Sequence, residues 1–156
     1  MTIIIIQTII FITYISFLLI KFKKVLPSIS DSWYMLKTPT NSLFTLFCFS
    51  IGLLMPFHIL GYYPFLFFLS GAGLCFTGAA TMFKDNKLTK KVHYIGAVFC
   101  ILFAFLGIGF EYNYWLPLIL YLISVILSKL FNVNNFIWWI EIYAFVFIVL
   151  GLLIVV

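Results

Sequence analysis

Long apolar runs alternate with short polar connections along the whole of this 156-residue chain. Each run has about 20 residues, the length that an α-helix needs to cross a hydrocarbon core about 30 Å thick. In lipid such a run is helical, because an unpaired backbone group there costs several kcal/mol. The pattern predicts an all-α integral membrane bundle of six transmembrane helices, forming a single domain over residues 1–156. The expected spans are 2–20, 42–60, 65–83, 92–110, 113–130 and 136–155.

The composition agrees with this class of protein. Hydrophobic residues make up 65% of the chain and charged residues only 8%, whereas a soluble globular domain is about 45–50% apolar and about 25% charged. The three cysteines lie inside predicted spans and form no Cys-x-x-Cys pair, so neither a disulfide framework nor a zinc knuckle is indicated.

The basic residues predict how the bundle is oriented. All nine are lysines, and all lie in the first and third connections between the spans or, for Lys129, at the edge of the fifth. Positively charged connections stay in the cytoplasm. We therefore expect the lysine-bearing loops inside, both termini outside, and a cytoplasmic or plasma membrane location. The net charge of +5 is then explained by lysines that flank the spans beside anionic lipid, and it does not indicate nucleic-acid binding. The lysines are Lys21, Lys23, Lys24, Lys37, Lys84, Lys87, Lys90, Lys91 and Lys129.

Small residues recur every four positions in the spans 65–83 and 92–110. Such stripes let two helix backbones approach closely, so we expect these two helices to form the tightest pair. Counting from the span ends places Gly71 level with Ala104, Cys75 level with Cys100, and Ala79 level with Gly96.

The connection at 21–41 is the only long one. Its apolar residues follow helical spacing, which predicts a short interfacial helix with Ser28 or Ser30 as its N-cap. Pro27 falls near the start of that helix. The apolar positions are Val25, Ile29, Trp33 and Leu36.

A candidate polar site lies in the inner half of the bundle. Its members are Ser28, Ser30, Asp31, His93 and Glu141. An ionisable residue inside a span faces the bundle or a wet cavity and pairs with another group, so Glu141 is the strongest member. A capping role for Asp31, an interfacial role for His93 and a structural ion pair at Glu141 remain the alternatives.

A second candidate locus lies at the outer side, where His58 and Glu111 can meet. Pro56 removes a helical hydrogen bond and is expected to free the carbonyl of Gly52. A kink beside a titratable group occurs in gated pores and transporters, although proline kinks are also common in membrane helices.

A metal site is not expected. His58 falls near the outer end of one span and His93 near the inner end of another, which separates them by on the order of 20 Å. A site with two histidines and one carboxylate therefore cannot form within one chain. No other pattern in the sequence requires a cofactor.

Three short motifs occur in order along the chain. They are Pro27-Ser28-Ile29-Ser30-Asp31, Val92-His93-Tyr94-Ile95-Gly96-Ala97 and Trp139-Ile140-Glu141. In these motifs the chain resembles the DRAM-like family of six-helix membrane proteins, which includes Sfk-like relatives and relatives linked to the remodelling of GPI-anchor lipids. Six-helix bacterial proteins of unknown function share the same layout. The resemblance implies a protein that acts on, senses or organises lipids, with Asp31, His93 and Glu141 as its shared polar residues.

Two features depart from the family pattern. The chain is shorter, with minimal loops, and its lysines place the first long connection in the cytoplasm. Eukaryotic members are generally drawn with that connection on the luminal side. The shared arrangement of polar residues survives this inversion, whereas a cellular role does not carry over.

The leading functional prediction is a non-enzymatic protein that interacts with membrane lipids or organises the membrane. Its polar pocket would open to the inner leaflet, and lysines would hold anionic headgroups, each contributing about 1 kcal/mol. The headgroup candidates are Lys21, Lys23, Lys24, Lys84, Lys87, Lys90 and Lys91.

Three other functions remain open. The first is a small proton-coupled transporter or channel subunit that uses Glu141 or the His58–Glu111 locus. The second is an intramembrane enzyme that modifies lipids, with His93 as acid and base. A Ser30–His93–Asp31 triad lacks the strand-turn-helix context of a nucleophile. The third is a purely structural partner, and the oligomeric state stays open.

Overall fold

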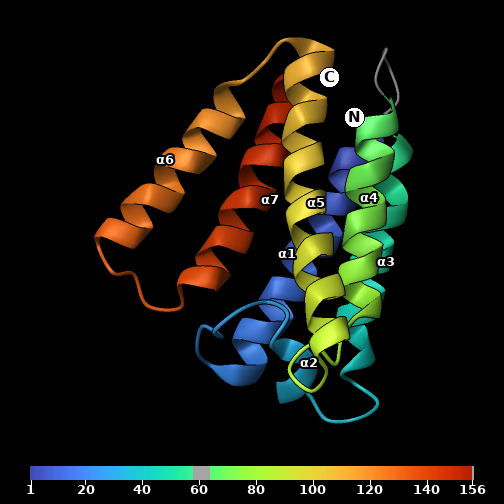
Figure 1. The fold of residues 1–156 in the computed structure, drawn as a ribbon, viewed down its shortest axis with the longest axis vertical. Coiled ribbons are helices and arrows are strands. Elements are labelled where there is room, and N and C mark those ends of the chain that lie inside the picture. Colours follow the sequence, from blue (N-terminus) through green and yellow to red (C-terminus); the bar gives the residue numbers. More distant parts are fainter. Residues whose placement is uncertain (58–63, 156) are drawn as a thin grey trace.

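The computed structural model describes residues 1–57 and 64–155, and these form helices joined by short connections, without a strand (Figure 1). The prediction of an all-α fold is therefore confirmed. The helices are α1 (Thr2–Phe22), α2 (Ser32–Met35), α3 (Ser42–Leu54), the 3₁₀ helix η1 (Met55–Phe57), α4 (Pro64–Ala79), α5 (Lys87–Tyr112), α6 (Leu116–Leu130) and α7 (Phe136–Val155).

Among the described residues, three helices are long and apolar enough to cross a membrane. These are α1, α5 and α7, with 21, 26 and 20 residues. The helices at the other three predicted spans are shorter: Ser42–Phe57, Phe65–Ala79 and Leu116–Leu130. At 1.5 Å per residue, the 15 residues of α6 extend over about 22 Å. The prediction of six full-length spans is therefore confirmed by length for three helices only.

The boundaries of α4 and α5 differ from the predicted ones. The α4 helix ends at Ala79, four residues before the predicted end of its span, and α5 already begins at Lys87. Asn86 caps α5, since its side-chain oxygen accepts a hydrogen bond from Leu88 N–H at 2.8 Å. A well-capped start lets the helix extend through polar residues that a hydropathy pattern assigns to the connection.

The predicted distortion at Pro56 takes a different form. The chain changes from α-helix to the 3₁₀ helix η1 at Met55. The sequence predicted a free carbonyl at Gly52. In the structure Met55 N–H donates a hydrogen bond to it. A 3₁₀ turn commonly satisfies the carbonyls at the end of a helix in this way.

The closest helix pair in the described part of the chain is α4 with α5, as predicted. The α5 helix uses the predicted face with Gly96 and Cys100, whereas the contacting face of α4 is a different one. A Cβ atom on Gly73 would lie 2.6 Å from the carbonyl oxygen of Gly96. Gly71 and Cys75 face α3 instead, because a Cβ atom on Gly52 would meet the Gly71 carbonyl oxygen at 2.7 Å and Cys75 Sγ at 2.8 Å. The predicted levels of the two stripes are therefore wrong.

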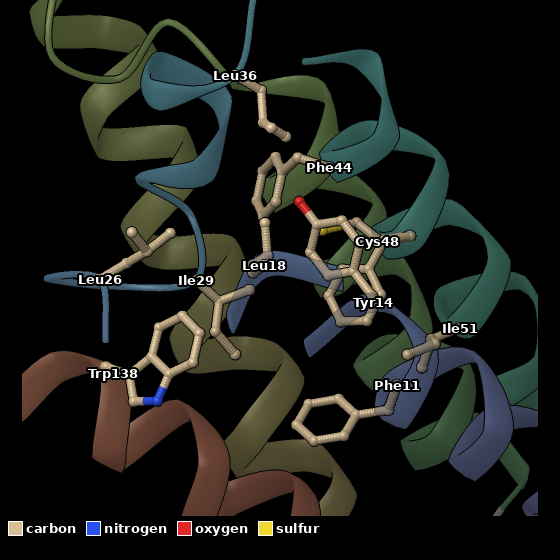
Figure 2. Packing of buried hydrophobic residues seen from close by; sticks show 11 residues of the cluster. Phe11, Tyr14, Leu18, Leu26, Ile29, Leu36, Phe44, Cys48, Ile51 and Trp138 are labelled. Carbon is tan, nitrogen blue, oxygen red and sulfur yellow. The ribbon is translucent and has the colours of Figure 1, made fainter. Parts of the chain in front are cut away.

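The connection between α1 and α3 is folded into the protein and is not an interfacial helix. Only Ser32–Met35 is helical, and Asp31 stands at its N-cap position in place of Ser28 or Ser30. Figure 2 shows Leu26 and Ile29 of this connection near Trp138 of α7. Leu26 is 0% exposed and Ile29 5%, so the connection contributes to the core at this end of the bundle.

The arrangement in Figure 1 places the lysine-bearing connections at the end of the bundle opposite both labelled termini. The α6 helix diverges from the bundle and packs mainly against α7. The remaining helices surround the core that holds the polar residues.

Candidate functional site

The Ser30 hydroxyl links His93 to Glu141. Ser30 Oγ lies 3.0 Å from His93 Nε2 and 3.4 Å from Glu141 Oε1. These side chains come from the connection after α1, from α5 and from α7. The sequence left open whether the inner polar residues meet, and the structure brings these three together.

Backbone carbonyls fix the orientation of the His93 ring. His93 Nδ1 lies 3.0 Å from the Thr77 carbonyl oxygen and 3.1 Å from that of Ala80. Carbonyl oxygens only accept, so Nδ1 carries a proton and donates it to them. The ring also stacks on Phe83 at a centroid distance of 4.1 Å. In the neutral imidazole, Nε2 is then the acceptor that faces Ser30.

Glu141 is held by the backbone of the connection after α1. Ile29 N–H donates to Glu141 Oε2 at 2.6 Å. Nearby, Trp138 N–H donates to the Pro27 carbonyl oxygen at 3.2 Å, which ties the first turn of α7 to the same segment. The carboxyl group is therefore positioned by backbone contacts on one side and by Ser30 on the other.

Asp31 lies apart from this cluster. Its carboxylate forms an ion pair with Lys84, and its N–H donates to Ser28 Oγ at 3.0 Å. Lys84 N–H also donates to the Tyr34 hydroxyl at 2.8 Å. Partial burial raises the pKa of the Tyr34 phenol above its ordinary value, so the hydroxyl stays neutral. Asp31 and Lys84 thus join the connection after α1 to the α4–α5 connection.

The other predicted residues lie outside the cluster. The remaining headgroup candidates have exposed side chains: Lys21, Lys23, Lys24, Lys87, Lys90 and Lys91. Glu111 lies in the last turn of α5, at the opposite end of that helix from His93. His58 lies outside the described residues, so the His58–Glu111 locus stays a prediction.

A cavity of about 120 Å³ adjoins Ser30 and Glu141. It is lined by side chains of α1, α3, α4, α5 and α7, and most of them are apolar, such as Phe11, Phe44 and Phe145. Apolar walls with a few polar groups are the lining of a ligand site, and this cavity is smaller than the roughly 300–1,000 Å³ of most such sites.

The sequence analysis missed two polar residues that line this cavity, Gln7 and Thr77. The Gln7 amide is 3% exposed and donates to the Ile51 carbonyl oxygen at 3.1 Å. Thr77 Oγ1 donates to the Gly73 carbonyl oxygen at 3.0 Å. An uncharged polar residue inside an apolar run was the available signal, since such residues face the protein interior.

The described residues contain no group of three or more His, Cys, Asp or Glu side chains placed to hold a metal ion. The cluster itself joins an imidazole, a hydroxyl and a carboxyl group, which can form hydrogen bonds and exchange protons.

Comparison with protein-family models, curated proteins and solved structures returned no match to this chain. The class that the fold defines is an α-helical protein with three helices apolar enough to span a membrane. The resemblance to the DRAM-like family rests on the three sequence motifs alone.

Proposed function

We propose that this chain is a multi-pass membrane protein that binds membrane lipid without chemical turnover. The observation that carries this proposal is the cavity, whose mostly apolar lining includes Ser30 and Glu141. An apolar chain gains by leaving water or by filling a void, while the polar groups of the lining give the ligand an orientation. We also propose kinship with the DRAM-like family on the basis of its three motifs.

The same proposal includes six membrane-crossing segments, with both termini outside and the lysine-bearing connections in the cytoplasm. Two observations support it. The lysine-bearing connections share one end of the bundle (Figure 1). In addition, α6 exposes a row of large apolar side chains that includes Ile119, Ile126 and Leu130, which suits lipid contact. A span shorter than the hydrocarbon core is accommodated when the bilayer thins locally.

Exposed lysines offer a second lipid contact, separate from the cavity, whose lining contains no lysine among the described residues. Lys21, Lys23 and Lys24 follow α1, and Lys87, Lys90 and Lys91 lie in the first turns of α5. A cationic rim attracts anionic headgroups, and each lysine near the surface contributes about 1 kcal/mol. Lys84 is the exception, because its ammonium group already pairs with Asp31.

Filling the cavity is expected to remove the bound lipid. Ala97 lines the cavity from α5, and Ala97→Leu adds a branched side chain to its wall. We expect co-purified lipid, measured by native mass spectrometry, to fall at least about tenfold in the variant, equivalent to about 1.4 kcal/mol of binding free energy.

The neighbouring substitution Val98→Leu is the matched control, because Val98 is 59% exposed and points away from the core. This control should keep the lipid content of the wild type. Equal lipid content in the wild type and in Ala97→Leu would contradict the cavity as the lipid site.

One contact favours a second function, the hydrolysis of lipid esters. Ser30 and His93 have the spacing of a nucleophile and its base, with Oγ 3.0 Å from Nε2. A fluorophosphonate probe decides the matter, because an activated serine oxygen bonds to its phosphorus and releases fluoride. Labelling of Ser30 that is lost in His93→Asn supports this second function. An unlabelled protein argues for lipid binding alone.

A further inference from the structure

The charges around the cavity restrict the head group that it can hold. Among the described residues that line it, Glu141 is the only Asp or Glu, and none is a lysine. Lys84 is paired with Asp31 outside the lining. An anionic head group such as a phosphate or carboxylate therefore meets no positive charge here and faces a carboxyl group.

Two acceptors compete for the one proton of the Ser30 hydroxyl. The hydroxyl has a single proton, and it lies between His93 Nε2 at 3.0 Å and Glu141 Oε1 at 3.4 Å. Neutral His93 has its other nitrogen engaged with backbone carbonyls, so Nε2 takes the Ser30 proton. Glu141 Oε1 is then left with the longer contact to Ser30 and can accept a second hydrogen bond from a donor in the cavity that Glu141 lines.

The other oxygen of Glu141 does not compete for that donor. Glu141 Oε2 accepts from Ile29 N–H at 2.6 Å, which also fixes the carboxyl group in place. The remaining polar side chains of the lining are engaged as donors to backbone carbonyls: the Gln7 amide to Ile51 and the Thr77 hydroxyl to Gly73. An acceptor in the lining of a mostly apolar cavity is complementary to an amphiphile with a donor head.

We propose that the cavity selects a single-chain amphiphile whose head group donates hydrogen bonds and carries no negative charge, namely a primary amine or an alcohol. The inference rests on the lipid-binding function proposed above and names its ligand class. The head group donates to Glu141 Oε1, and the chain lies against the apolar side chains of α1, α3 and α7. An amine pairs with the ionised carboxylate, whereas an alcohol pairs with either form.

The size of the cavity indicates suitable probes. Its volume of about 120 Å³ is similar to that of an engineered apolar cavity of about 150 Å³ that binds benzene. Hexylamine, hexanol and hexanoate match this volume, share one chain and differ in the head group alone. Their binding to the protein in phosphatidylcholine nanodiscs is measured by saturation-transfer NMR, with empty nanodiscs as the background.

We expect hexylamine and hexanol to bind at least about tenfold more tightly than hexanoate, because a hydrogen bond to a charged group and the loss of like-charge repulsion each contribute on this scale. In Glu141→Gln the single amide oxygen stays with Ile29 N–H, and an NH₂ group replaces Oε1 on the cavity side. Hexylamine should then lose at least about tenfold in affinity, while hexanol should change less than about threefold, since its hydroxyl oxygen can accept from that NH₂ group. Glu111→Gln is the matched control and should bind all probes as the wild type does.

The outcomes separate this inference from the function on which it rests. Hexanoate binding as tight as that of hexanol, or unchanged hexylamine binding in Glu141→Gln, overturns the donor-head proposal while lipid binding stands. If no probe binds the wild type more tightly than it binds Ala97→Leu, both proposals fail. Glu141→Gln keeps the acceptor for Ile29 N–H, and retained hexanol binding shows that the variant is folded.

Discussion

Gly73→Val is expected to prevent stable folding of the bundle. A Cβ atom at Gly73 would lie 2.6 Å from the Gly96 carbonyl oxygen and 2.7 Å from the Cys100 nitrogen. Both are backbone atoms of α5, so no rotamer change relieves the overlap, and the two helices must separate. We expect a loss of at least about 3 kcal/mol in the free energy of unfolding, measured by thermal and denaturant unfolding in mild detergent.

The control for this prediction is Ala79→Val. Ala79 is exposed at the end of the same helix, so the added methyl groups meet no neighbouring backbone. We expect its free energy of unfolding to stay within about 0.5 kcal/mol of the wild type. A Gly73→Val protein that unfolds at the same temperature as Ala79→Val would show that α4 and α5 do not approach through Gly73 and Gly96.

The helix pairing was predictable from the sequence, but the contacting face of α4 was not. The α4 helix packs against α3 on one side and α5 on the other, and both neighbours come close to its backbone. Small residues therefore line two faces, one with Gly71 and Cys75 and the other with Gly73 and Thr77. A stripe of small residues predicts a close approach, but it does not say which neighbour makes it.

The helix ends were predictable only where the hydropathy of the sequence changes at the same residue as the backbone hydrogen bonding. Lys87–Lys91 is polar but helical, because Asn86 caps α5 upstream of it. At Pro56 the apolar run continues while the α-helix gives way to a 3₁₀ turn. Hydropathy reports burial in lipid or protein, whereas capping and proline geometry determine where hydrogen bonding changes.

The sequence identified the residues of the candidate site, but it did not predict which of them contact one another. Ser30, His93 and Glu141 do meet, whereas Asp31 pairs with Lys84 on another side of the connection. Adjacent residues in a turn point in different directions, and a sequence does not state which of Ser30 and Asp31 points to the core. The direction of these side chains is set when the connection folds against α7 through the hydrogen bond from Ile29 N–H to Glu141.

His93→Leu is expected to destabilise the protein by about 2 kcal/mol or more. His93 Nδ1 supplies the donor for the Thr77 and Ala80 carbonyl oxygens, and the side chain is 3% exposed. Leucine buries these acceptors without that donor, which costs about 1–3 kcal/mol for each group left unsatisfied. Thermal unfolding in mild detergent measures the loss.

The variant His93→Asn separates the two sides of the imidazole. The asparagine amide nitrogen takes the place of Nδ1 and donates to the same carbonyl oxygens, but nothing replaces Nε2 beside Ser30. We expect His93→Asn to recover more than half of the stability that His93→Leu loses.

In His93→Asn the Ser30 hydroxyl is then free to donate to Glu141 Oε1, which lies 3.4 Å away. The acceptor proposed for the ligand head group becomes occupied, so hexylamine and hexanol should bind more weakly to a folded protein. If His93→Asn is as unstable as His93→Leu, the carbonyl contacts of Nδ1 do not carry the structural role. If it is stable and binds both probes as the wild type does, the Ser30 proton does not decide which acceptor at Glu141 is available.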